Sequence, residues 1–129
     1  MNPETRFSRR LRKLFDKGHD IRVENPAGPG TPDINACING VEFWAETKQV
    51  KALPKKPETP VFTGVMRPDQ KLWLHKRSKA GGRCYIVAYV EAEDLTYVIP
   101  GNHAYEFEGM NKSQLDEINL PVRAMWSPS

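Results

Sequence analysis

The sequence of 129 residues has only two cysteines, Cys37 and Cys84, and no long apolar run. Two cysteines cannot build a disulfide scaffold and are not spaced like zinc ligands, so we expect reduced, buried thiols. No stretch approaches the ~18 apolar residues of a membrane helix, and the basic start lacks the apolar core of a secretory signal. We therefore expect a single domain over residues 1–129, in the cytoplasm and without a membrane partner.

Acidic residues are scarce in the first two-thirds of the chain. Residues 1–83 contain 17 Lys and Arg against 9 Asp and Glu, whereas residues 84–129 contain 2 against 7. A basic front part favours a polyanionic partner such as nucleic acid, although a basic solvated surface is the simpler alternative. The tail from about residue 100 is expected to form an acidic C-terminal extension of the same domain.

Apolar periodicity predicts an α/β fold, in which a mixed central sheet is flanked by two helices. The first helix is predicted over residues 4–17, and its inward stripe consists of Phe7, Leu11, Leu14 and Phe15. The second helix begins near Pro68, which suits a first helical turn, and ends at Gly81-Gly82. Its apolar side is expected to consist of Leu72, Trp73 and Lys76.

Strands are expected at 21–23, within 32–48, at 84–90 and at 95–99, with a short helix at 111–119. The apolar segment 84–90 is typical of a central strand that is buried on both faces and parallel to the strand that ends near residue 48. The Pro- and Lys-rich segment 51–66 is predicted to be a mobile loop.

Asn39-Gly40, between two extended segments, predicts a hairpin with a two-residue type I′ turn. In that register the apolar pairs share one face of the hairpin. The other face sets Asp33 directly opposite Glu46, with their Cβ atoms about 4.5–5.5 Å apart. Lys48 projects from the same face because it lies two residues beyond Glu46.

Two carboxylates at that distance repel each other unless they share a proton or bind a cation. Hard oxygen ligands favour Mg²⁺ or Mn²⁺ over zinc, and the backbone carbonyl of Thr47 lies at the edge of the same site. Lys48 is either a salt-bridge partner or a group that stabilises an attacking hydroxide or a phosphate. The alternative for the whole cluster is a set of surface charges on a solvated sheet face.

Pro32-Asp33, followed after 12 residues by Glu46-Thr47-Lys48, resembles the signature of the PD-(D/E)XK nucleases. Two groups within that superfamily are similar to residues 4–90: the endonuclease I kind of phage Holliday-junction resolvases, and the small VRR-NUC-like nucleases. The second likeness rests on Arg67-Pro68-Asp69-Gln70, on Gly81-Gly82 and on the apolar segment 84–90. The resemblance implies a restriction-endonuclease-like core.

The resemblance also implies roles for individual residues. Asp33 and Glu46 would hold Mg²⁺, for which Mn²⁺ substitutes, and Lys48 would assist attack by a metal-bound water on a phosphodiester. A glutamate on the first helix and a glutamine near the site are common in relatives, and Glu4 and Gln70 fit these positions. The alternatives are an acid stabilised by the helix dipole for Glu4 and an ordinary first-turn polar residue for Gln70.

These features predict a metal-dependent DNA endonuclease that selects branched DNA by structure rather than by sequence. A non-catalytic nucleic-acid-binding protein with a degenerate nuclease fold is the alternative. A two-fold symmetric junction demands two sites, so we expect a homodimer. We expect no small-molecule cofactor beyond the metal. If the protein is encoded by a phage, we expect it in the host cytoplasm. Contacts to the DNA backbone are expected from Arg6, Arg9, Arg10, Lys13, Lys51, Lys55, Lys56, Arg67 and Lys71.

Overall fold

The computed structural model describes residues 3–15, 18–23 and 28–128, with side chains from Arg6 onward. In chain order the elements are α1 (Pro3–Lys13), β1 (His19–Arg22), β2 (Ile34–Ile38), β3 (Val41–Val50), α2 (Pro68–Lys79), β4 (Cys84–Val90), β5 (Leu95–Pro100), η1 (Gly101–His103), η2 (Phe107–Gly109), α3 (Lys112–Ile118) and η3 (Val122–Trp126). None of the helices in these ranges is long and apolar enough to cross a membrane.

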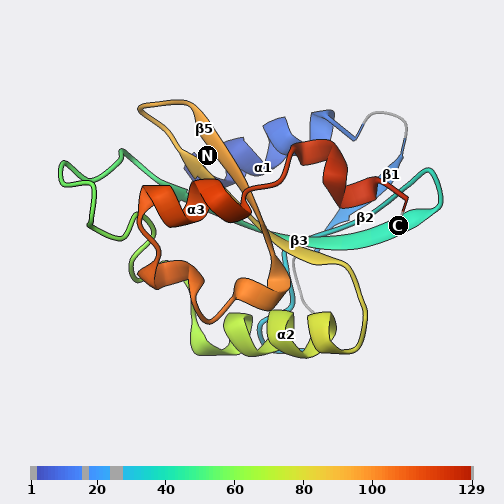
Figure 1. The fold of residues 1–129 in the computed structure, drawn as a ribbon. Helices are drawn as coiled ribbons and strands as arrows, with labels where there is room; N and C mark the ends of the chain where they lie inside the picture. The colour runs from blue at the N-terminus through green and yellow to red at the C-terminus, as the bar shows by residue number, and fades with distance from the viewer. Residues whose placement is uncertain (1–2, 16–17, 24–27, 129) are drawn as a thin grey trace.

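The five strands form one mixed sheet in the order β1-β2-β3-β4-β5. β3 and β4 are parallel, joined by a crossover through α2, and the other neighbours are antiparallel. All seven residues of β4 are buried, as predicted for a central strand. Figure 1 shows α1 and α2 on opposite sides of the sheet.

The predicted hairpin is confirmed in register and in turn type. Ile34 pairs with Ala45 and Ile38 with Val41, as the two-residue turn requires. Both turn residues have a positive φ, 52° at Asn39 and 81° at Gly40, which is the type I′ conformation.

Each face of the sheet carries its own apolar core. On the α1 side, Phe7, Leu11 and Phe15 pack on residues of β2, β3 and β4. On the α2 side, Leu74 and Phe62 pack on β4 and β5 together with residues from the C-terminal segment. Ala104, Phe107 and Leu115 of this segment are fully or almost fully buried, so residues 101–126 are part of the packed domain.

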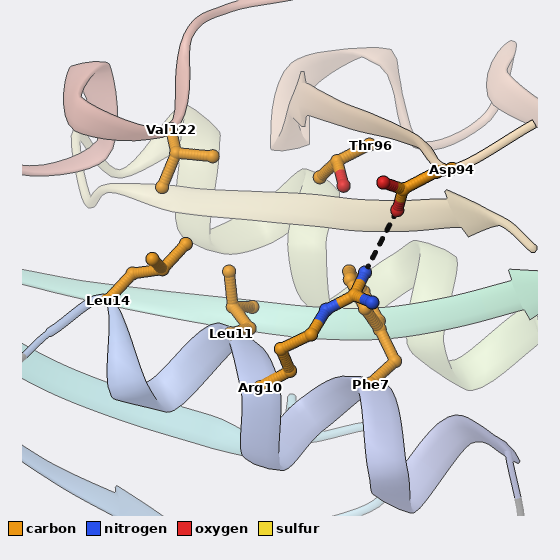
Figure 2. A pocket seen from close by; sticks show the side chains of 7 residues that line it. All are labelled: Phe7, Arg10, Leu11, Leu14, Asp94, Thr96 and Val122. Atoms are coloured by element: carbon orange, nitrogen blue, oxygen red, sulfur yellow. Dashed lines mark hydrogen bonds and ion pairs between the residues drawn. The ribbon is translucent and has the colours of Figure 1, made fainter.

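The first helix is shorter than predicted. α1 ends at Lys13, and residues 14 and 15 continue only as turns, while Asp16 and Lys17 lie outside the described residues. Leu14 is therefore not part of the inward stripe: it is 56% exposed at the rim of a hollow of about 370 Å³ between α1 and Val122 (Figure 2). The three buried apolar residues of this segment recur every four positions, and Leu14 falls outside that spacing.

The predicted apolar side of α2 is also wrong in part. Leu72 is 43% exposed, and the fully buried apolar residue of this helix is Leu74. One turn before Leu74 the inward position is occupied by a polar residue, Gln70, which is buried as well. That polar residue on the inner stripe hid the helical period from the sequence pattern.

The segment predicted as a mobile loop is anchored in its second half. Phe62 is fully buried and Val61 is almost so, and both belong to the core on the α2 side. The Val61 N–H donates to the carbonyl of Met110, and the Met66 N–H donates to the Glu108 carboxylate, both at 3.1 Å. Long-range contacts with the tail therefore hold a stretch whose composition alone indicated mobility.

Candidate active site

The central residues of the site come from the middle of β3. Side chains alternate along a strand, so Glu46 and Lys48 face α2 while Thr47 faces α1. The Trp44 N–H donates to the Arg83 carbonyl on the β4 side. Because backbone direction also alternates, the N–H and C=O of Thr47 point toward the β2 side, where Asp33 lies.

Asp33 is bound to Thr47 through both of its carboxylate oxygens. The Thr47 N–H donates to Oδ1 at 2.9 Å, and the Thr47 hydroxyl donates to Oδ2 at 2.6 Å. Each carboxylate oxygen has two lone pairs, so a single bond from Thr47 does not saturate it; the backbone N–H of Asp33 itself also donates to the carboxylate. The contact orients the carboxylate of Asp33 just before β2 without saturating it.

Burial raises the pKa of Asp33 above its usual value, and the hydrogen bonds from Thr47 and from its own backbone, together with the charge of Arg22, lower it only in part. An ionised carboxylate at this position is therefore less stable than one in water. A cation bound next to Asp33 would favour the ionised form and offset this cost.

Glu46, Lys48 and Gln70 form a buried polar cluster between β3 and α2. Their side chains lie in residues that are only 4%, 8% and 5% exposed. Glu46 Oε2 lies 3.3 Å from Lys48 Nζ and accepts a hydrogen bond of 3.2 Å from the Gln70 amide. The alternative of a solvated surface cluster is therefore wrong, because α2 covers this face of the sheet.

The first turn of α2 fixes the orientation of the Gln70 amide. The Arg67 N–H donates to Gln70 Oε1 at 3.0 Å, so the amide nitrogen is the atom that turns toward Glu46. The Gln70 N–H donates both to the Arg67 carbonyl at 3.1 Å and to Asp69 Oδ1 at 2.9 Å, which fixes the backbone of this turn. Gln70 thus connects the end of a helix to the carboxylate at the centre of the sheet, which is more than an ordinary first-turn residue does.

The loop that leads into Asp33 passes directly against this helix start. Gly30 has φ +78°, and a Cβ built on it would lie 2.1 Å from the Asp69 carbonyl oxygen and 2.8 Å from the Gln70 nitrogen. Only glycine fits here, on both conformational and steric grounds. This contact sets the distance between the segment that carries Asp33 and the helix that carries Gln70.

The donor set suits a hard divalent cation. Asp33 and Glu46 supply two carboxylates, and the Thr47 carbonyl lies on the same side of β3 as Asp33. Within the described ranges, no group of three or more His, Cys, Asp or Glu side chains gathers as a metal site. Mg²⁺ commonly uses one or two carboxylates and keeps several waters, so the residues present fit it. The predicted role of Glu4 stays a prediction, because its side chain lies outside the described residues.

The basic residues predicted to bind DNA differ in their surroundings. Lys71 is partly buried and forms an ion pair with Glu108, and Arg10 lies 3.5 Å from Asp94. Arg67 is paired with Asp69 at 3.2 Å. Eight of the nine are exposed: Arg6, Arg9, Arg10, Lys13, Lys51, Lys55, Lys56 and Arg67.

Glu108 is a residue of this region that sequence reasoning missed. Its carboxylate accepts from the Met66 N–H and pairs with Lys71, so it ties the loop before α2 to the helix. Burial by itself raises the pKa of Glu108, but the hydrogen bonds and the charge of Lys71 hold the pKa below its usual value. No local pattern indicates this role, since Glu108 lies about 40 residues from both partners.

No protein-family model matches this sequence, and no curated protein matches it. Among solved structures, the fold is similar to the 1.6 Å structure of Hjc from Archaeoglobus fulgidus, a Holliday junction resolvase from an archaeal hyperthermophile. The TM-score is 0.65 at 21% sequence identity, and the match covers 95% of this chain and 94% of that chain. The chain therefore has an α/β restriction-endonuclease-like fold, as predicted. The narrower likeness to VRR-NUC-like or phage enzymes stays a prediction.

Proposed function

We propose that this protein is a Mg²⁺-dependent DNA endonuclease that hydrolyses phosphodiester bonds in branched DNA, such as Holliday junctions. The observation that carries the proposal is the buried Glu46–Lys48–Gln70 cluster beside the oriented carboxylate of Asp33. Burying charged groups costs several kcal/mol per ion, so such a cluster is a poor device for stability alone. A buried carboxylate with a raised pKa, such as that of Asp33, is typical of a reaction site.

Asp33, Glu46 and the carbonyl of Thr47 would hold the cation, and Mn²⁺ would substitute for Mg²⁺. When bound, the cation would supply positive charge for the phosphate and lower the pKa of a water. Hard oxygen donors without a thiolate or imidazole match these two cations better than zinc.

The remaining side chains orient the reacting groups. The Lys48 ammonium is fixed by Glu46 and is buried, so its charge acts in a medium of low dielectric constant. There it can hold the attacking water and stabilise the negative charge that develops on the phosphate. The Gln70 amide keeps Glu46 in one rotamer by donating to Oε2.

The exposed basic residues of α1 and of the loop after β3 would contact the DNA backbone, which favours recognition by shape over recognition by sequence. Two sites are needed to cut a two-fold symmetric junction, so we infer a homodimer with DNA as its partner in the cytoplasm. The similar archaeal structure, itself titled a Holliday junction resolvase, supports this choice of substrate. Glu4 is retained as a further candidate for the site.

The test is a cleavage panel with a four-way junction, supercoiled plasmid, linear duplex and single strand, each in Mg²⁺, Mn²⁺ or EDTA. Asp33→Asn serves as the site variant and Glu42→Gln as its control, because Glu42 is an exposed carboxylate on β3. We expect metal-dependent cleavage of the junction by the wild type and by Glu42→Gln, and none by Asp33→Asn. Tight binding of the junction without cleavage in any metal would favour the non-catalytic alternative.

A further inference from the structure

A second feature of the α2 side is a stack of two tryptophans and one arginine. Trp44 of β3 and Trp73 of α2 meet edge to face, with ring centroids 5.3 Å apart. The Arg77 guanidinium lies over both rings, at 4.7 Å from the Trp73 centroid and 5.7 Å from the Trp44 centroid. Trp44 is thus covered by residues of α2.

The backbone at Gly82, just after α2, lies close against the side chain of the same arginine. A Cβ built on Gly82 would lie 2.4 Å from Cδ and 2.9 Å from Cγ of Arg77. Gly82 does not require a positive φ, so the absence of its side chain serves this close approach and not the backbone conformation. Arg77 is therefore held in one position although it is exposed to solvent.

Arg77 lies in a basic part of the chain and has, among the described residues, no carboxylate of its own to pair with. No ion pair joins Arg77 to a carboxylate in the described part of the chain. Residues 70–90 contain no Asp or Glu and five basic residues: Lys71, Lys76, Arg77, Lys79 and Arg83. A stacked guanidinium keeps its N–H groups at the edge of the plane, where they match two oxygens of a phosphate.

The position of Arg77 relates directly to the candidate site. Trp44 lies two residues before Glu46 on the same face of β3, and Gln70, which binds Glu46, lies seven residues before Arg77 on α2. Seven residues of helix span about 10 Å.

We infer that Arg77 is a positioning residue that binds a backbone phosphate of the substrate strand near the bond that is cut. The two tryptophans and Gly82 prepare the guanidinium for this contact, so little side-chain entropy is lost on binding. The inference rests on the proposed function, since it assigns the site its neighbouring phosphate.

The test measures the affinity of each variant for a fluorescent four-way junction in EDTA, where no metal-dependent cleavage occurs, at several salt concentrations. Arg77→Ala removes the contact, and Arg77→Lys keeps the charge but not the planar stack. Gly82→Ala displaces the arginine without changing any charge. Arg123→Ala is the control, because it removes one exposed positive charge from η3.

We expect Arg77→Ala to weaken binding about tenfold. Its slope of log K against log salt should fall in magnitude by about one. Arg77→Lys and Gly82→Ala should each lose several-fold in affinity, while Arg123→Ala binds as the wild type. In Mg²⁺ the KM of Arg77→Ala should rise with kcat nearly unchanged.

If Arg77 serves only to cover the tryptophans, Arg77→Ala will lose stability in urea but bind the junction as tightly as Arg123→Ala, which would overturn the inference. The inference would also be overturned if Gly82→Ala or Arg77→Lys bound the junction as tightly as the wild type. The position of Arg77 against the tryptophans would then not contribute to binding. A wild-type protein that binds the junction through Arg77 but cleaves no substrate would refute the proposed nuclease and leave this phosphate contact in place.

Discussion

Substitution of Gly30 tests how the site is assembled, because Gly30 lies where the segment that carries Asp33 contacts the helix that carries Gln70. An alanine Cβ would lie 2.1 Å from the Asp69 carbonyl oxygen, so the two backbones must separate by about 1.3 Å to reach an ordinary contact of 3.4 Å. The positive φ alone costs about 1–2 kcal/mol for alanine. Forced separation of packed segments adds about 1–3 kcal/mol.

Gly40 is the matched control, since it also has a positive φ but nothing lies within 4 Å of the position that a Cβ would take there. Gly40→Ala should therefore lose only about 1–2 kcal/mol of unfolding free energy and cleave at the wild-type rate. Gly30→Ala should lose about 2–5 kcal/mol in all. Its cleavage rate should fall about 100-fold, because a shift of about 1 Å misplaces Asp33 relative to Gln70.

Urea denaturation followed by tryptophan fluorescence gives the unfolding free energies, and single-turnover cleavage of the junction gives the rates. If Gly30→Ala and Gly40→Ala agree in both measurements, the contact between the loop and α2 does not position the site. A Gly30→Ala variant that is destabilised but cleaves normally would refute the functional half of the reasoning.

Three further predictions concern the carboxylates and their partners. Gln70→Glu should lower the unfolding free energy by about 1–3 kcal/mol and abolish cleavage, since it removes a donor to Glu46 and adds a like charge. Gln70→Met adds no charge, so it should retain more cleavage activity than Gln70→Glu. Glu108→Gln should lower the free energy of unfolding by about 1 kcal/mol at pH 7, because partners in the fold lower the pKa of Glu108. This stabilisation is fully present above the ordinary pKa of 4.5 and is lost as the pH falls through the lower pKa of the folded state. The unfolding free energies of the wild type and the variant should therefore converge in acid. Asp33→Asn should have a higher melting temperature than the wild type at pH 7 without metal, because burial raises the pKa of Asp33 and its ionised form destabilises the fold. This difference in melting temperature should shrink as the pH falls and Asp33 becomes protonated. Mg²⁺ should raise the melting temperature of the wild type but not that of the variant.

The hairpin could be predicted because its information is local. Two turn residues that accept a positive φ determine the register, and the side-chain period of two then determines which residues share a face with Glu46. The same reasoning found the parallel central strand, since seven consecutive apolar residues do not suit a surface strand.

The burial of the site could not be predicted in this way, because it depends on how α2 packs across the sheet. In the sequence, Glu46 and Lys48 indicate a solvent-exposed face of the strand. That face is buried only because α2 packs over it. Gln70 was a candidate by resemblance, but its role as a donor to Glu46 follows from the amide orientation that Arg67 fixes. Glu108 and the anchoring of Phe62 involve contacts between segments far apart in the chain, for which no periodicity exists.

We propose that metal-dependent hydrolysis occurs at two carboxylates, Glu46 of β3 and Asp33 just before β2. The most direct measurement is single-turnover cleavage of an end-labelled four-way junction in Mg²⁺ by the wild type, Glu46→Gln and Glu42→Gln, with EDTA as the blank. We expect the wild type and Glu42→Gln to cleave the junction and EDTA to abolish this cleavage. Glu46→Gln should cleave at least 100-fold more slowly, a loss of about 2.7 kcal/mol in transition-state stabilisation. Equal rates for the two glutamine variants, or cleavage that persists in EDTA, would contradict it.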